Sequence, residues 1–154
     1  MSRYMNLIGK NAKKASLEKI NSTLKNKILK RYALLLDKER NSIIKANTKD
    51  IKFSQKKGLK NNLIDRLTIG HKELDNIKNS INKITKLKDP VDNTLEKWSR
   101  PNGLKIKRVS IPIGVIGVIY ESRPNVTSDV ASLCFKSGNA VILKGGSEAI
   151  NTNK

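Results

Sequence analysis

The sequence is poor in cysteine, histidine and aromatic residues. Its 154 residues include one cysteine, Cys134, and one histidine, His71, and aromatic residues make up 4% of the chain. A single cysteine cannot form a disulfide within the chain, and one cysteine with one histidine does not provide a zinc site. We therefore expect a protein of a reducing compartment that holds no metal.

The sequence also lacks long apolar runs. Nowhere do about 18 apolar residues stand together, and the first residues, MSRYMNLIGKNAKKAS, contain no apolar segment of the kind that a secretory signal needs. We expect a soluble, cytoplasmic protein with no membrane partner. Apolar residues still make up 37% of the chain, which is enough for one domain with a core.

Acidic residues are few compared with basic ones. The chain has 32 Lys and Arg against 13 Asp and Glu, a formal net charge of +19. The lysines are dispersed and aromatic residues for base stacking are scarce, and A/T-rich codons alone explain the excess of Lys, Asn and Ile. We predict no nucleic-acid partner, and keep as an alternative a basic module that binds nucleic acid or an anionic surface.

The pattern before residue 100 is helical. One apolar stripe has spacings of three and four residues and predicts a helix with one buried face: Leu17, Ile20, Leu24, Ile28, Tyr32 and Leu35. Residues 43–50 extend or restart this helix, which ends near Gly58, and residues 59–70 are expected to be a short connection with one helical turn at most. A second stripe lies between Gly70 and Pro90: Leu74, Ile77, Ile81 and Ile84.

The pattern after residue 100 is that of strands. Residues 104–110 alternate between apolar and basic, as in a half-exposed strand, and residues 113–120 are almost continuously apolar, as in a strand covered on both faces. A helix from Val126 to a stop at Gly138 precedes a short buried strand, residues 140–143. This order predicts an α/β fold with a parallel sheet, left incomplete at Lys154, so we expect the chain to be the N-terminal part of a longer protein. Trp98 is expected to anchor the linker to the core.

Polar residues follow both apolar strands. They occupy residues 121–125 and 144–147, and ligands of open parallel sheets bind beyond the carboxyl ends of strands. Lys144 with Gly145 and Gly146 suits a phosphate group, although a surface lysine beside a Gly-Gly turn has the same pattern. Neither a P-loop nor a Rossmann glycine motif is present.

Three single residues have alternative interpretations. Asn125 stands where a helix begins, so it either caps that helix or forms the turn before it, or it directs its amide at an oxyanion. Cys134 falls on the apolar face of the same predicted helix, which favours a core residue over a nucleophile. His71 is interpreted as a solvated turn residue.

Residues 100–149 resemble a block of the gamma-glutamyl phosphate reductases, also called glutamate-5-semialdehyde dehydrogenases. The similarity rests on two runs, PIGVIGVIYESRPNVTSD (residues 112–129) and FKSGNAVILKGGSEA (residues 135–149). It extends more loosely to KANTKDI (residues 45–51) and LIDRLTI (residues 63–69). Within that family, the chain matches the N-terminal portion.

The resemblance implies an aldehyde-dehydrogenase-type, Rossmann-like fold and an enzyme of proline biosynthesis. Residues 1–100 would be the helical region of the cofactor domain and residues 101–154 the first strands and crossover helix of its NADP-binding part, without the catalytic domain. The implied reaction is NADPH-dependent reduction of L-glutamyl 5-phosphate to L-glutamate 5-semialdehyde and phosphate, after which the product cyclises to 1-pyrroline-5-carboxylate. A cysteine of the catalytic domain would form a thioacyl intermediate, so this chain alone would be inactive.

The resemblance also implies partners and site residues. The full-length enzyme is expected to be a homo-oligomer, and a truncated product that joins full-length subunits is a further possibility. Asn125 matches the catalytic asparagine that stabilises the oxyanion. In the family, Lys144 contacts the adenosine ribose, and Ser147 occupies the place of a glutamate that binds ribose hydroxyls in NAD-using relatives, which favours NADP. Glu148 follows one position later, so a shift of one residue would restore that carboxylate. The expected cofactor-binding residues are Glu121, Ser122, Arg123, Lys144, Gly146 and Ser147.

Overall fold

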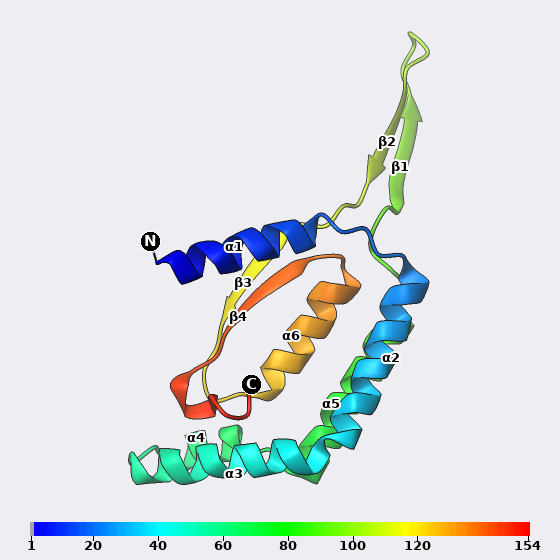
Figure 1. Cartoon of the computed structure of the whole chain (residues 1–154). Coiled ribbons are helices and arrows are strands. Elements are labelled where there is room, and N and C mark those ends of the chain that lie inside the picture. The colour runs from blue at the N-terminus through cyan, green and yellow to red at the C-terminus, as the bar shows by residue number, and fades with distance from the viewer. Residues whose placement is uncertain (1) are drawn as a thin grey trace.

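The computed structural model describes residues 2–154, with helices in the first half of the chain and a mixture of strands and a helix in the second (Figure 1). The helices are α1 (Arg3–Ser16), α2 (Ser22–Lys38), α3 (Arg40–Lys56), α4 (Asn61–Leu67), α5 (His71–Lys86) and α6 (Asn125–Lys136). The strands are β1 (Thr94–Ser99), β2 (Lys105–Val109), β3 (Val115–Ile119) and β4 (Ala140–Lys144), and a 3₁₀ turn, η1, covers Ser147–Ala149. This order confirms the predicted α/β class with a helical region first.

Helices α2 and α5 form the apolar core. The predicted stripe on α5 is confirmed, since its four apolar residues are buried and Ile81 is 0% exposed. They pack with Leu29 and Ala33 of α2. Helix α5 begins after Gly70, whose backbone N–H donates to the Glu73 carboxylate, and it ends before Pro90 as expected. The core therefore lies between two helices that are side by side in Figure 1.

The stripe predicted for the first helix is wrong. Leu17 and Leu24 are 70% and 44% exposed, and α2 instead buries Lys25, Leu29 and Ala33. A break at residues 17–21 separates Leu17 and Ile20 from α2, and within α2 the buried face lies one position after Leu24 and Ile28, at Lys25 and Leu29. The buried Lys25 ammonium pairs with Asp89 at 3.0 Å, which makes this position compatible with burial.

A new helix, α3, begins after α2, as predicted, and ends at Lys56. Gly58, two residues later, is in the left-handed region with φ 73°. The buried side chains of α3 are polar and comprise Asn47, Asp50 and Ser54. The predicted connection over residues 59–70 is wrong, because α4 takes up seven of these residues. His71 is the first residue of α5 and is exposed, and its carbonyl accepts a hydrogen bond from Arg40.

Strands β3 and β4 pair in parallel, as predicted, with α6 connecting them. Helix α1 contacts both strands and α6 contacts β4. The expectation that residues 113–120 are covered on both faces is wrong, since Ile113 and Ile119 are 84% and 77% exposed. Ile113 precedes β3 and Ile119 is its last residue, whereas Val115, Ile116 and Val118 are half-buried.

Strands β1 and β2 form an antiparallel hairpin that projects away from the other elements (Figure 1). Strand β1 was not predicted, and it lies on the helical side of the expected boundary at residue 100. Trp98 belongs to β1 opposite Ile106 and is 39% exposed, so it does not anchor a linker to the core. Within residues 2–154, no helix combines the length and apolarity required to cross a membrane.

Candidate functional site

The two predicted site segments begin at neighbouring strand ends. Ile119, the last residue of β3, stands opposite Lys144, the last residue of β4, and the Tyr120 N–H donates to the Lys144 carbonyl at 3.1 Å. Because the strands are parallel, residues 121–125 and residues 145–147 leave the same edge of the sheet. The structure thus brings together the segments that the sequence analysis singled out.

A carboxylate joins the two segments directly. Glu148 accepts hydrogen bonds from the backbone N–H and the hydroxyl of Ser122. Ser122 is buried and has a positive φ of 44°, an uncommon conformation for a non-glycine residue, while Glu121 and Arg123 on either side are exposed. The carboxylate of Glu148 is therefore engaged inside the chain, and Ser122 is a structural contact between the two segments.

The glycines after β4 leave room for the side chains of neighbouring residues. A Cβ atom on Gly145 would collide with the side-chain amide of Asn153, and one on Gly146 would collide with the Glu148 carboxylate. Lys144 and Ser147 on either side are exposed. Lys144 makes none of the ion pairs found within residues 2–154, so its ammonium group is available to an anion.

Asn125 is the first residue of α6 and does not cap it. The N-cap position is Pro124, and no side chain makes a cap hydrogen bond there. The Asn125 amide instead donates to the Asp129 carboxylate, one turn further along α6, at the long distance of 3.4 Å. The capping alternative is thus wrong, and the exposed amide keeps hydrogen-bonding capacity for another group.

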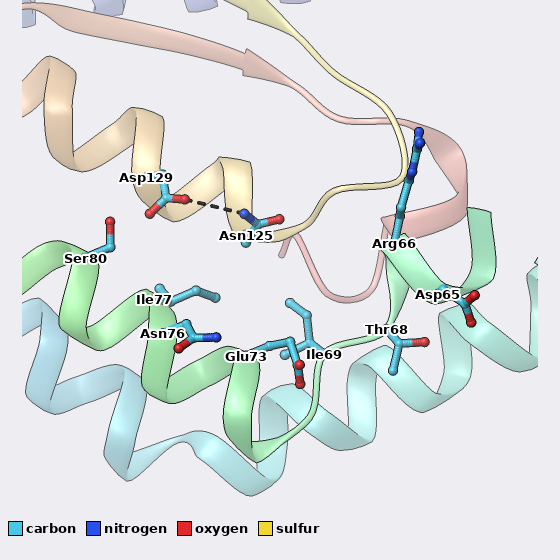
Figure 2. A pocket seen from close by; sticks show the side chains of 10 residues that line it. All are labelled: Asp65, Arg66, Thr68, Ile69, Glu73, Asn76, Ile77, Ser80, Asn125 and Asp129. Atoms are coloured by element: carbon cyan, nitrogen blue, oxygen red, sulfur yellow. Dashed lines mark hydrogen bonds between the residues drawn. The ribbon is translucent and has the colours of Figure 1, made fainter. Parts of the chain in front are cut away.

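Asn125 opens into a cleft of about 600 Å³ between the start of α6 and helices α4 and α5 (Figure 2). Figure 2 shows Asn125 and Asp129 on one side of this cleft, with Glu73, Asn76 and Ile77 on the other. The other lining residues are Asp65, Arg66, Thr68, Ile69 and Ser80. None of the six expected cofactor-binding residues belongs to the described lining of this cleft.

The cleft residues were missed in the sequence because no motif marks them as a group. Four of them lie within LIDRLTI, residues 63–69, a segment noted only for its resemblance. Asp129 lies at the end of the run around Asn125, and its spacing of four residues in a helix gave the signal that it faces the same side.

Buried polar groups of α3 hold the segment after β4 in place. Both carboxylate oxygens of Asp50 accept hydrogen bonds, one from the backbone and side chain of Asn151 and the other from those of Thr152. Asn47 accepts from the Ile69 N–H and donates to the Leu67 carbonyl and the Thr152 hydroxyl. Helix α3 therefore positions both the α4–α5 loop beside the cleft and the segment that follows Ser147.

Cys134 lies in the core, as predicted. It is 7% exposed, and burial raises the pKa of its thiol. A raised pKa disfavours the thiolate, so Cys134 is unsuited to nucleophilic attack. No group of three or more His, Cys, Asp or Glu residues that could hold a metal ion occurs in the described part of the chain.

Curated relatives of the chain share one name. This chain is 49% identical over 146 residues to the gamma-glutamyl phosphate reductase of Thermodesulfovibrio yellowstonii, and the match covers 94% of this chain and 35% of that protein. It is 47% identical over 156 residues to that of Clostridium tetani, covering 100% of this chain and 36% of that protein. The chain thus spans just over a third of the length of these relatives, and no family model matches it.

The chain also matches solved structures of gamma-glutamyl phosphate reductases. The crystal structure of gamma-glutamyl phosphate reductase from Thermotoga maritima matches 94% of this chain and 35% of its own, with a TM-score of 0.90 and 42% identity. The corresponding structure from Saccharomyces cerevisiae matches 99% and 39%, with a TM-score of 0.92 and 35% identity. The arrangement of α1 to η1 described above is therefore shared with experimental structures.

Proposed function

Since this chain is homologous to the N-terminal portion of the gamma-glutamyl phosphate reductases, we propose that it forms part of an enzyme that reduces L-glutamyl 5-phosphate to L-glutamate 5-semialdehyde. Phosphate is released, and the product cyclises to 1-pyrroline-5-carboxylate. The observation that carries this proposal is the position of Asn125. Its amide stands at the mouth of a polar cleft, makes one long hydrogen bond, and does not cap its helix.

The chemistry calls for a group that stabilises negative charge on an acyl oxygen. A thiolate that attacks the acyl phosphate turns the carbonyl oxygen into an oxyanion, and expulsion of phosphate leaves a thioester. The Asn125 side-chain N–H groups are suited to donate to that oxygen because α6 fixes the backbone from which they project. Cys134 does not supply the thiolate, since it is buried with a raised pKa, so the nucleophile is assigned to a residue outside this chain. Residues 1–154 alone are then inactive.

The turn after β4 fits a dinucleotide phosphate. The exposed residues Lys144 and Ser147 flank Gly145 and Gly146, while the neighbouring carboxylate of Glu148 accepts hydrogen bonds from Ser122. NADPH, when bound, supplies the hydride that reduces the thioester. We propose that Lys144 and Ser147 receive its 2′-phosphate, with Gly146 between them, and that the exposed residues Glu121 and Arg123 line the adjoining part of the cofactor site, while the buried Ser122 holds their segment to Glu148.

The proposal is tested with Asn125→Ala in the full-length protein that contains these residues. Reduction of thioacylated enzyme or, in reverse, phosphate-dependent oxidation of the semialdehyde is followed with NADPH or NADP. We expect kcat to fall by roughly 10²-fold or more, the usual cost of removing one oxyanion donor. The wild-type protein should have a higher kcat/KM with NADPH than with NADH.

Asn41→Ala serves as a matched control, because Asn41 is an exposed residue of α3 outside the lining of the cleft. An unchanged kcat in a folded Asn125→Ala protein would exclude the oxyanion role. Equal use of NADPH and NADH would exclude the assignment of Lys144 and Ser147 to the 2′-phosphate. A wild-type protein without reductase activity would overturn the function itself.

A further inference from the structure

The cleft beside Asn125 contains a carboxylate whose hydrogen bonding is incomplete. Asp129 lies one helical turn after Asn125, and the two side chains point into the same cleft in Figure 2. Its Oδ2 accepts only the 3.4 Å bond from Asn125, and its Oδ1 is buried without a hydrogen-bond partner in the part of the chain that the structure describes. Within residues 2–154 it joins none of the ion pairs. A partly buried carboxylate in this state is stabilised by a cation that enters the cleft.

The other carboxylates of the cleft differ from Asp129. Glu73 accepts the Gly70 N–H and so is used to begin α5. Asp65 is exposed and lies at the other end of the cleft in Figure 2. Arg66 is also at that end, so the cleft has a carboxylate on one side and a guanidinium on the other. Such a pair of opposite charges complements a zwitterionic ligand.

We infer that Asp129 binds the α-ammonium group of the amino-acid substrate and thereby selects amino acids over simple dicarboxylic acids. The inference rests on the proposed function, because it takes the acyl group to lie at Asn125. Four bonds join the acyl carbon of a glutamyl group to its amine nitrogen, about 5 Å in an extended chain. Side chains four residues apart on a helix have Cβ atoms about 5–6 Å apart. The Asn125 amide and the Asp129 carboxylate are 3.4 Å apart in this structure, so both groups are within reach of one glutamyl group.

The variant Asp129→Asn tests this in the full-length protein. It keeps the size of the side chain and removes the charge. The two substrates for the oxidative direction are glutamate 5-semialdehyde and 5-oxopentanoate, which has the same carbon chain and carboxylate but no amino group. We expect kcat/KM for the amino substrate to fall by roughly 10- to 100-fold, the range for losing a hydrogen bond to a charged group, and kcat/KM for 5-oxopentanoate to stay nearly constant.

The matched control is Asp92→Asn, which removes an exposed carboxylate between α5 and β1, outside the lining of the cleft. It should change kcat/KM for either substrate by no more than about fivefold. Equal losses with both substrates in Asp129→Asn would mean that Asp129 acts through Asn125 or the fold, and would overturn the inference. Unchanged values with both substrates would overturn it as well.

A binding measurement separates this inference from the proposed function. Calorimetry with L-glutamate and with glutarate, which lacks the ammonium group, compares the two ligands without any turnover. We expect the wild type to bind L-glutamate more tightly and Asp129→Asn to lose this difference. Equal affinity of the wild type for both ligands would overturn the inference, whereas a retained difference in a protein without reductase activity would support it and reject the proposed function alone.

Discussion

Helices α5 and α3 have nearly the same length, and each buries one face, but the two faces differ in chemistry. The buried face of α5 is apolar and packs on α2, whereas that of α3 consists of Asn47, Asp50 and Ser54. The face of α5 stabilises the core through area removed from water. The face of α3 fixes two loops through directional hydrogen bonds, and both of these loops lie next to the candidate site. The comparison shows that stability and positioning are assigned to different helices.

The largest expected loss of stability comes from a substitution in α5. Ile81→Ala removes atoms from a side chain that is 0% exposed, so the free energy of unfolding should fall by about 4 kcal/mol. Urea unfolding followed by circular dichroism measures this loss. Ile113→Ala, at a position that is 84% exposed, is the control and should change the free energy by no more than about 0.5 kcal/mol. Equal losses at both positions would contradict the view of α5 as the core helix.

A substitution in α3 is expected to lower the free energy of unfolding by less, and to change hydrogen exchange locally. Asp50→Asn leaves an amide group facing donors of Thr152, so the free energy of unfolding should fall by about 2–3 kcal/mol. Hydrogen exchange should increase chiefly at residues 151–152 rather than in α5. Asp65→Asn is the control, because Asp65 is exposed and joins none of the ion pairs within residues 2–154. Uniformly faster exchange in α5 would show that Asp50 supports the core instead of this segment.

The smallest effect concerns the surface contact between α2, α3 and α5. Lys78 and Arg40 donate hydrogen bonds to Asp37 and lower the pKa of its carboxyl group. Because the folded-state pKa is the lower one, this contribution is complete above the unfolded pKa of about 4 and is lost as pH falls through the folded-state value.

Asp37→Asn should therefore reduce the decrease in Tm between pH 5 and pH 3, and 1 M salt should diminish the difference because the group is on the surface. Thermal melts at the two pH values measure this. An identical acid dependence in the variant and the wild type would show that the ion pairs do not contribute.

The same comparison explains which parts of the fold the sequence could predict. The stripe on α5 was visible because apolar residues at helical spacing identify a buried face without further information. The face of α3 was not visible, because a buried Asn or Asp has the same letter as an exposed one. The hairpin strand β1 was missed for a similar reason, since its six residues are all exposed and leave no alternating pattern.

The candidate site was predictable only in part. The adjacency of residues 121–125 and 144–147 follows from parallel pairing of two consecutive strands, and it was predicted correctly. The cleft in front of Asn125 depends on how α4 and α5 lie against α6, which periodicity within single helices does not report. Glu148 accepts a hydrogen bond from Ser122, which has a positive φ, and no local sequence motif indicates that conformation.

The hydrogen bonds between Asp50 and residues 151–152 also have a consequence for the order of folding. They connect positions about 100 residues apart, and closing so long a loop is entropically costly before other contacts exist. The pairing of α2 with α5 spans a shorter stretch of chain and can form first. The turn at residues 145–147 should then acquire its final shape late, after α3 has formed a surface to receive the segment that follows it.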